Sequence, residues 1–223
     1  MQKLLLASLL ALLAASTSFA QNVAWVKSIG NTGVDKAVST TIDQVGNVYT
    51  CGHFIKQSDF DPGPGVFPLY AYDEDVFFQK MDASGQFVWA VSLFDAQGVV
   101  CTDISVDENG FIYATGYFSE AVDFDPSPLQ NILTAANGIH GFDIFILKLT
   151  SAGEFVWAKQ MGGTEYDKGR SIKVDQSGNI YTVGEFQGTV DFDPGPGVTE
   201  MVTNGFAEDI FIQKLNSDGQ FVW

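Results

Sequence analysis

The sequence contains three copies of Asp-Phe-Asp-Pro, and each copy places two carboxylates two residues apart. The six aspartates are Asp59, Asp61, Asp123, Asp125, Asp191 and Asp193. In an extended segment, residues two apart point to the same side, so each pair would set two carboxylates side by side. Ca²⁺ takes oxygen ligands from carboxylates and from turn carbonyls. We therefore consider these aspartates as candidate calcium ligands, and no other cofactor is expected. The alternative is a metal-free turn, since Asp before Pro commonly starts one.

A catalytic site requires residues that break a repeat, because one site occurs in one place. The candidates of this kind are His53, Glu120, His140, Arg170 and Glu185. His53 aligns with Tyr117 and Glu185, which indicates a variable position on the surface of a strand. The order of residues supports no Ser-His-Asp triad, histidine cluster or Cys-His pair. Two opposed carboxylates, as in glycosidases, remain an alternative, but no pair can be singled out. The sequence therefore favours a protein without catalytic activity.

Three markers recur along the chain with one period. Tryptophans occur at intervals of 64, 68 and 66 residues, at Trp25, Trp89, Trp157 and Trp223. The Asp-Phe-Asp-Pro element and a Gly-x-x-Tyr element both recur at intervals of 64 and 68 residues. A shared period indicates tandem structural units. We expect three repeats, at about 25–88, 89–156 and 157–222.

Each repeat is expected to form four antiparallel strands. The first strand is short and ends at a turn. An aspartate opens this turn and a glycine stands three residues later, as at Asp107 and Gly110. The second carries a fixed glycine, such as Gly116, which indicates a bulge or a close backbone approach. The third is nearly all apolar, which indicates burial on both faces. A Phe-Val-Trp strand closes the unit, and the recurring tyrosines and tryptophans are expected in the core or between units, with sugar stacking as a lesser alternative.

Tandem units of four antiparallel strands are typical of β-propeller blades. One blade has two apolar faces, and only neighbouring blades can cover both. A β-solenoid is the rival architecture, but its rungs are shorter, commonly about 20–30 residues. Known propellers close with about four to eight blades, so three repeats predict an incomplete, open propeller. The chain is then either part of a longer protein or a three-blade chain that pairs with a second copy.

At these residues the chain resembles the bacterial SBBP family of β-propeller repeats. The first half of the family pattern is matched by Asp175, Gly178, Asn179, Tyr181 and Gly184, and the second half by Asp143, Phe145, Lys148, Leu149, Gly153, Trp157, Gly162 and Gly163. The chain departs from it by an Asp-Phe-Asp-Pro-Gly-Pro-Gly insert between the second and third strands. That insert is similar to one in large secreted bacterial surface proteins. The resemblance implies an exported propeller and no reaction, because the family is defined by its fold.

The composition disfavours several classes of partner. Among 223 residues, 27 are acidic and 11 are basic, which gives a formal net charge of −16. Binding to DNA or RNA relies on Lys and Arg that neutralise phosphates, so nucleic acid is close to excluded. Docking on an anionic membrane surface is disfavoured for the same reason. An apolar content of 46% is too high for a disordered chain.

Residues 1–20 read as a secretory signal peptide. Lys3 precedes an apolar run from Leu4 to Ala15, and Ser18 and Ala20 supply small residues for cleavage before Gln21. A membrane anchor is the alternative, but the apolar run of about a dozen residues is short of the roughly 20 that a spanning helix needs. We expect a chain that does not span the membrane and that is exported, either to the cell surface or to the medium.

Export permits disulfides, and the chain has two cysteines, Cys51 and Cys101. Both lie in expected strands of neighbouring repeats, so a bridge between them is conceivable. The sequence does not fix the separation that a disulfide requires. The alternative is a pair of small buried hydrophobic side chains.

These observations together predict a non-catalytic, exported β-propeller segment that acts as a binding or structural module of a cell-surface or secreted protein. Its expected partners are a protein or glycan ligand, and either the remaining blades of a longer chain or a second copy. The alternative function is that of a carbohydrate-active enzyme domain on the same scaffold.

Overall fold

The computed structural model describes residues 24–223, apart from 31–32, 94–97 and 206. The predicted signal peptide, residues 1–20, lies outside the described residues. Within the described part of the chain, no helix is long and apolar enough to cross a membrane. Regular structure there consists of antiparallel strands and one short 3₁₀ turn, η1 (Gly138–His140). The prediction of an all-β chain is confirmed.

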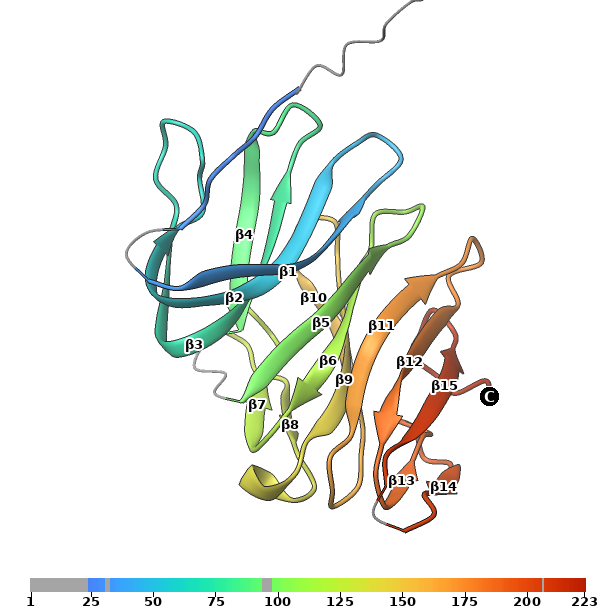
Figure 1. Ribbon diagram of the computed structural model, residues 1–223. Coiled ribbons are helices and arrows are strands. Elements are labelled where there is room, and N and C mark those ends of the chain that lie inside the picture. The colour runs from blue at the N-terminus through green and yellow to red at the C-terminus, as the bar shows by residue number, and fades with distance from the viewer. Residues whose placement is uncertain (1–23, 31–32, 94–97, 206) are drawn as a thin grey trace, which may run out of the picture.

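Each repeat forms one main antiparallel sheet (Figure 1). Sheet 1 contains, in spatial order, β1 (Asp35–Ile42), β2 (Val48–Asp59), β3 (Pro68–Met81) and β4 (Phe87–Leu93). Sheet 2 contains β5 (Val99–Val106), β6 (Ile112–Phe118), β9 (Asp143–Leu149) and β10 (Phe155–Met161). Sheet 3 contains β11 (Lys168–Val174), β12 (Ile180–Phe186) and β15 (Asp209–Leu215), and Phe221 adds a bridge to Leu215. The predicted strand order is therefore present in full in sheets 1 and 2.

The Asp-Phe-Asp-Pro inserts form hairpins beside the sheets. In sheet 1 the insert lengthens β2 and β3, which stay paired out to Asp59 and Pro68. In sheet 2 it forms the small pair β7 (Ala121–Asp123) and β8 (Ile132–Thr134). In sheet 3 it forms β13 (Thr189–Asp191) and β14 (Glu200–Val202).

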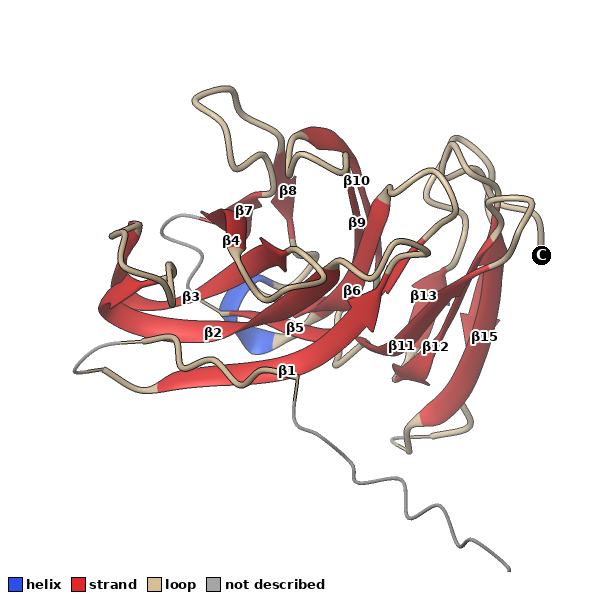
Figure 2. Ribbon diagram, turned by 90° about the horizontal axis from the view of Figure 1, so that it is seen from above, coloured by secondary structure: helices blue, strands red, loops and turns tan. Residues whose placement is uncertain are grey.

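Sheet 2 lies between sheets 1 and 3. The first strands β1, β5 and β11 contact one another in that order, and the sheets spread apart toward their later strands (Figures 1 and 2). Two apolar clusters fill the spaces between neighbouring sheets, and a third covers the other side of sheet 1. Most of the core therefore lies between sheets, as expected for units that cannot bury both faces alone.

The third strands show that each sheet has two apolar faces to cover. Val76 and Phe78 of β3 are buried against sheet 2, whereas Phe77 between them is buried on the opposite face. Ile144 and Ile146 of β9 are buried in the same way against sheet 3. Side chains alternate across a strand, so an unbroken apolar run fills both faces. The predicted burial of this strand on both faces is confirmed for sheets 1 and 2 and is wrong for sheet 3, where Ile210 and Ile212 are exposed.

The fixed glycine of the second strand allows a close backbone approach. A Cβ added to Gly116 would lie 1.8 Å from the Val100 carbonyl oxygen and 2.9 Å from the Phe145 ring. The register of the neighbouring strand shifts beside it, between Cys101 and Asp103. Both features that the glycine indicated, a bulge and a close approach, are therefore present.

Candidate binding surfaces

The Asp-Phe-Asp-Pro aspartates bind backbone amides of their own hairpin loops. Asp123 Oδ1 accepts hydrogen bonds from the amides of Asp125 (3.1 Å) and Asn131 (2.8 Å), and Asp125 Oδ1 accepts one from Ser127 (2.9 Å). The equivalent bonds occur at Asp59 and Asp61 and at Asp191 and Asp193. This geometry matches the metal-free turn. Within the described residues, no group of three or more His, Cys, Asp or Glu side chains is arranged to hold a metal. Calcium binding by the six aspartates stays a prediction.

The phenylalanine between the two aspartates anchors the hairpin. Phe124 is fully buried, and its ring lies 5.2 Å from that of Phe118 and 5.0 Å from that of Phe145. Phe60 and Phe192 are buried against equivalent phenylalanines in the other sheets. Reasoning from carboxylate chemistry missed this role, although Phe at a fixed place in all three copies was the available signal.

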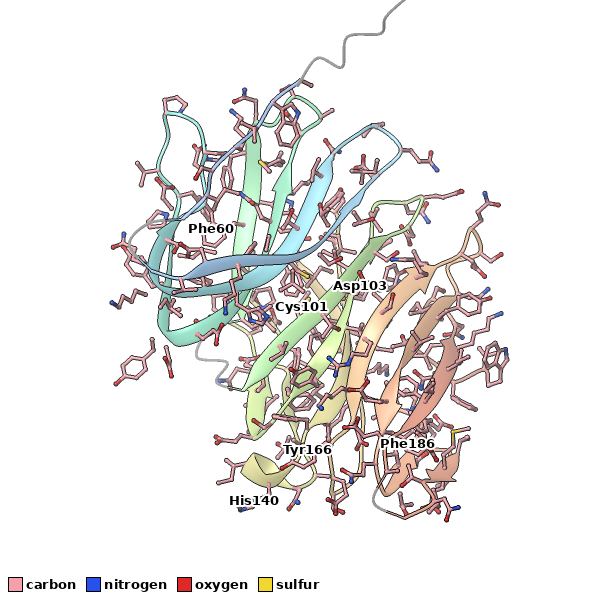
Figure 3. The ribbon with its side chains drawn as sticks, in the orientation of Figure 1. Phe60, Cys101, Asp103, His140, Tyr166 and Phe186 are labelled. Carbon is pink, nitrogen blue, oxygen red and sulfur yellow. The ribbon has the colours of Figure 1, made fainter. Side chains whose placement is uncertain are left out.

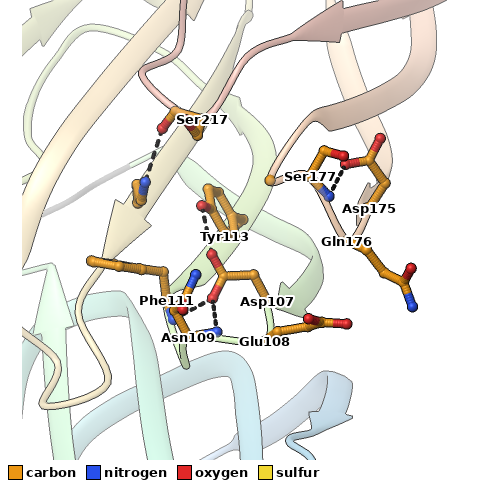
Figure 4. Close-up of a pocket in the computed structure, with 11 residues that line it drawn as sticks. Asp107, Glu108, Asn109, Phe111, Tyr113, Asp175, Gln176, Ser177 and Ser217 are labelled. Atoms are coloured by element: carbon orange, nitrogen blue, oxygen red, sulfur yellow. Dashed lines mark hydrogen bonds between the residues drawn. The ribbon is translucent and has the colours of Figure 1, made fainter.

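A polar cleft of about 450 Å³ lies between the Asp107 turn of sheet 2 and the Asp175 turn of sheet 3 (Figure 4). Asp107 accepts hydrogen bonds from the amides of Asn109 and Phe111, both at 2.9 Å, and from the Tyr113 hydroxyl at 3.1 Å. The Lys148 ammonium donates to the Ser217 carbonyl oxygen at 2.8 Å and lies over the Phe111 ring. The Asp107 carboxylate and the Lys148 ammonium are therefore both bound to protein groups.

Burial and these contacts shift the pKa values of two groups in the cleft. Burial lowers the pKa of Lys148, although nearby Asp107 and Asp218 partly oppose that change. Burial and the Asp107 carboxylate raise the pKa of Tyr113. Tyr49 and Tyr113 are buried and bond to their turn aspartates, so their predicted core role is confirmed. The cleft therefore offers polar surface for a ligand.

The Ser151 and Ser217 turns form a seam between neighbouring sheets. Trp89 Nε1 and Lys80 Nζ of sheet 1 both donate to the Ser151 carbonyl oxygen of sheet 2, at 3.1 and 3.3 Å. Lys148 of sheet 2 reaches Ser217 of sheet 3 in the equivalent way. The lysine of one sheet thus binds a turn of the next at both interfaces, and the tryptophan does so at the first.

Asp103 joins all three sheets at their first strands (Figure 3). Its carboxylate accepts hydrogen bonds from the Ser39 hydroxyl of sheet 1 (2.7 Å) and from the Ser171 hydroxyl (2.6 Å) and Ile172 amide (2.9 Å) of sheet 3. Burial alone would raise the pKa of Asp103, but these hydrogen bonds and nearby Lys173 lower it overall. Sequence reasoning did not select Asp103. The available signal was that Asp103 breaks the repeat, because the equivalent positions in the other copies are Ser39 and Ser171.

Among the residues that the structure describes, none covers the apolar outer face of sheet 3. Ile210 and Ile212 of β15 are 82% and 60% exposed, whereas their equivalents Val76, Phe78, Ile144 and Ile146 are 0% exposed. Trp223, which ends the same face, is 53% exposed. A shallow cleft of about 650 Å³ adjoins this face, lined by Ile210, Phe186 and residues of β14. We call this surface, centred on Ile210 and Ile212, the open face.

The five candidate catalytic residues do not form one site. His53, expected on the surface of a strand, is 7% exposed, so that interpretation is wrong: the side chain is buried and burial lowers its pKa. His140 lies in η1 and Glu120 follows β6. Arg170 and Glu185 form an ion pair across β11 and β12, in which the Arg170 Nε lies 3.0 Å from the Glu185 carboxylate. This pair occupies the partly exposed surface of sheet 3.

Repeated antiparallel sheets that pack face to face define the chain as an all-β tandem-repeat protein. The sequence profile of the SBBP family, described as a beta-propeller repeat, matches residues 156–185. The chain is also similar to an uncharacterized WD repeat-containing protein of Acanthamoeba polyphaga mimivirus, with 24% identity over 227 residues. That match covers 90% of this chain and 16% of the relative, so the chain spans about a sixth of the relative's length.

Proposed function

We propose that the chain is an exported, non-catalytic β-propeller module in which each sheet is one blade and the open face lies on the third. It serves as a binding or structural part of a cell-surface or secreted protein. The exposure of Ile210 and Ile212 carries this proposal, because the same positions are fully buried in the other two sheets. Export rests on the signal-peptide pattern of residues 1–20.

The open face fits a further blade of the same repeat. In the other two sheets this face is covered by the first strands of the next sheet, β5 and β11. The seam residues are also in place, since Trp223 packs against Tyr181 as Trp89 packs against Tyr49. A blade that presents a β5-type strand and a turn carbonyl would therefore complete contacts that sheets 1 and 2 already make.

Purified residues 21–223 test this proposal, because the only blades available in that sample belong to another copy. Light scattering should detect association of the chain at micromolar concentration. Ile210→Lys combined with Ile212→Lys should shift it to the monomer, since a buried charge without a partner is strongly unfavourable. Val198→Lys is the matched control, because Val198 is 72% exposed in the insert loop of the same sheet and lies outside the open face.

A wild-type chain that remains monomeric at all concentrations would contradict the proposal. Association that Ile210→Lys with Ile212→Lys leaves unchanged would also contradict it. A glycan array and a glycosidase substrate screen on the same sample separate the functional classes. Retention of a glycan without turnover supports a binding module, and the absence of both retention and turnover supports a structural one. Turnover of a substrate would overturn the non-catalytic assignment.

A further inference from the structure

The two cysteines meet between sheets 1 and 2. Cys51 lies on β2 and Cys101 on β5, and both side chains are 0% exposed (Figure 3 labels Cys101). Their Sγ atoms are 2.8 Å apart. Unbonded carbon atoms in contact lie about 3.5–4.0 Å apart, and sulfur is larger. The two sulfurs are therefore closer than two unbonded thiols pack.

This contact is produced by the repeated geometry of the fold. The equivalent positions between sheets 2 and 3 are Thr115 and Gly169, and a Cβ added to Gly169 would lie 2.3 Å from Thr115 Oγ1. The second strand of one sheet thus touches the first strand of the next at this point in both interfaces. At the first interface, both positions are cysteine.

We propose that Cys51 and Cys101 form a disulfide that covalently joins sheet 1 to sheet 2. A disulfide has an S–S bond of about 2.05 Å, so a shift of less than about 1 Å closes it. The reaction is exchange with a small-molecule or protein disulfide. One cysteine thiolate attacks that disulfide and releases a thiol, and the second thiolate then displaces the oxidant from the mixed disulfide. The two cysteines lose two protons and two electrons, and the oxidant becomes two thiols.

Burial determines when the bridge forms. Burial raises the pKa of the Cys101 thiol well above its usual value, and neighbouring Cys51 raises it further. The reactive species is the thiolate, so the folded protein is a poor substrate for exchange. The bond therefore forms before sheets 1 and 2 are fully packed, and once formed it is shielded from external thiols.

Refolding in a mixture of oxidised and reduced glutathione tests the bridge without depending on export. After refolding, the protein is denatured in guanidinium and treated with iodoacetamide, with and without prior reduction. We expect no alkylated cysteine before reduction and two after it, by intact mass. A second wild-type sample is reduced in denaturant and refolded with dithiothreitol. We expect its melting temperature to be about 5–10 °C lower than that of the oxidised sample.

The variant Cys51→Ala with Cys101→Ala provides the control, because its melting temperature should not respond to dithiothreitol. Circular dichroism shows whether it folds. Two alkylated cysteines without prior reduction, or a disulfide-linked dimer on a non-reducing gel, would overturn the proposal. A chain that forms the bridge on refolding but is not exported in cells would instead contradict the proposed location alone.

Discussion

At the scale of single residues, Asp103 shows how one side chain can hold three sheets in register. Its carboxylate accepts hydrogen bonds from sheets 1 and 3 while it belongs to sheet 2. Lys173 also approaches it, at 3.3 Å, but the lysine side chain is 71% exposed. Exposed ion pairs contribute little to stability, so the hydrogen bonds carry most of the effect.

Asp103→Asn should lower the free energy of unfolding by about 2–3 kcal/mol, because an amide cannot accept all of these bonds and leaves the buried Ile172 amide poorly paired. Lys173→Gln should cost less than about 1 kcal/mol. Urea unfolding at pH 7 compares the two. Because the folded-state pKa of Asp103 is lowered, its contribution is present above pH 3.8 and is lost as pH falls through the folded value. Equal losses in the two variants would contradict the assigned role.

Asp167 has the opposite pH dependence. It is fully buried and accepts the Gly163 and Gln187 amides, at 2.7 and 3.0 Å. Burial raises its pKa from 3.8 to about 6, although these hydrogen bonds oppose the shift. The folded chain then holds this proton more tightly than the unfolded chain. Stability from this group is present below about pH 4 and is lost as pH rises through about 6.

The wild type should therefore lose about 1.4 kcal/mol of unfolding free energy between pH 5 and 7.5 relative to Asp167→Asn. The variant loses hydrogen bonds at every pH, but it lacks this titration. Urea unfolding of both proteins at the two pH values measures how much unfolding free energy each one loses between them. Parallel pH profiles would show that Asp167 does not titrate in this range.

At the scale of elements, the insert hairpin is held by its phenylalanine. The aspartates on either side of Phe124 organise the loop backbone, while the ring enters the core of sheet 2. This arrangement explains why both the aspartates and the phenylalanine recur, because the carboxylates and the ring perform separate tasks. A purely metal-binding element would not require a buried ring at that position.

Phe124→Ala should lower the free energy of unfolding by about 3–5 kcal/mol, as for other buried aromatic side chains. Leu129→Ala in the same loop should change it by less than about 0.5 kcal/mol, because Leu129 is 73% exposed. Denaturant unfolding of the two variants measures the difference. Similar small effects would mean that the hairpin is an independent surface loop.

Strand order, turn positions and the buried third strand could be predicted from sequence because each leaves a local pattern. Apolar runs, turn glycines and a shared period are visible without coordinates. The role of Asp103 and the Cys51–Cys101 contact could not be predicted, because they depend on which strands of different sheets touch. His53 was misplaced for the same reason: its exposure depends on sheet 2, some 50 residues further along the chain. The role of Phe124 was missed, although a phenylalanine at this place in all three copies is visible in the sequence.

At the scale of the whole molecule, the repeated interfaces determine where the structure can be extended. Sheets 1 and 2 each cover one face with a following sheet, through the same apolar positions and the same contact of a lysine with the next turn. Sheet 3 presents those positions to solvent. One edge of its third strand is paired only at its end, where Phe221 pairs with Leu215 and Trp223 bonds to Lys214. Uncovered edges of this kind favour association.

Hydrogen–deuterium exchange of β15 as a function of protein concentration tests the central claim most directly. If the open face binds a further blade, amides of Ile210–Gln213 should be protected at high concentration and should exchange faster on dilution, as the partner copy dissociates. The equivalent strand β9, already covered by sheet 3, should exchange equally at both concentrations. Exchange of β15 that does not depend on concentration would contradict the claim that this face is a blade-binding surface.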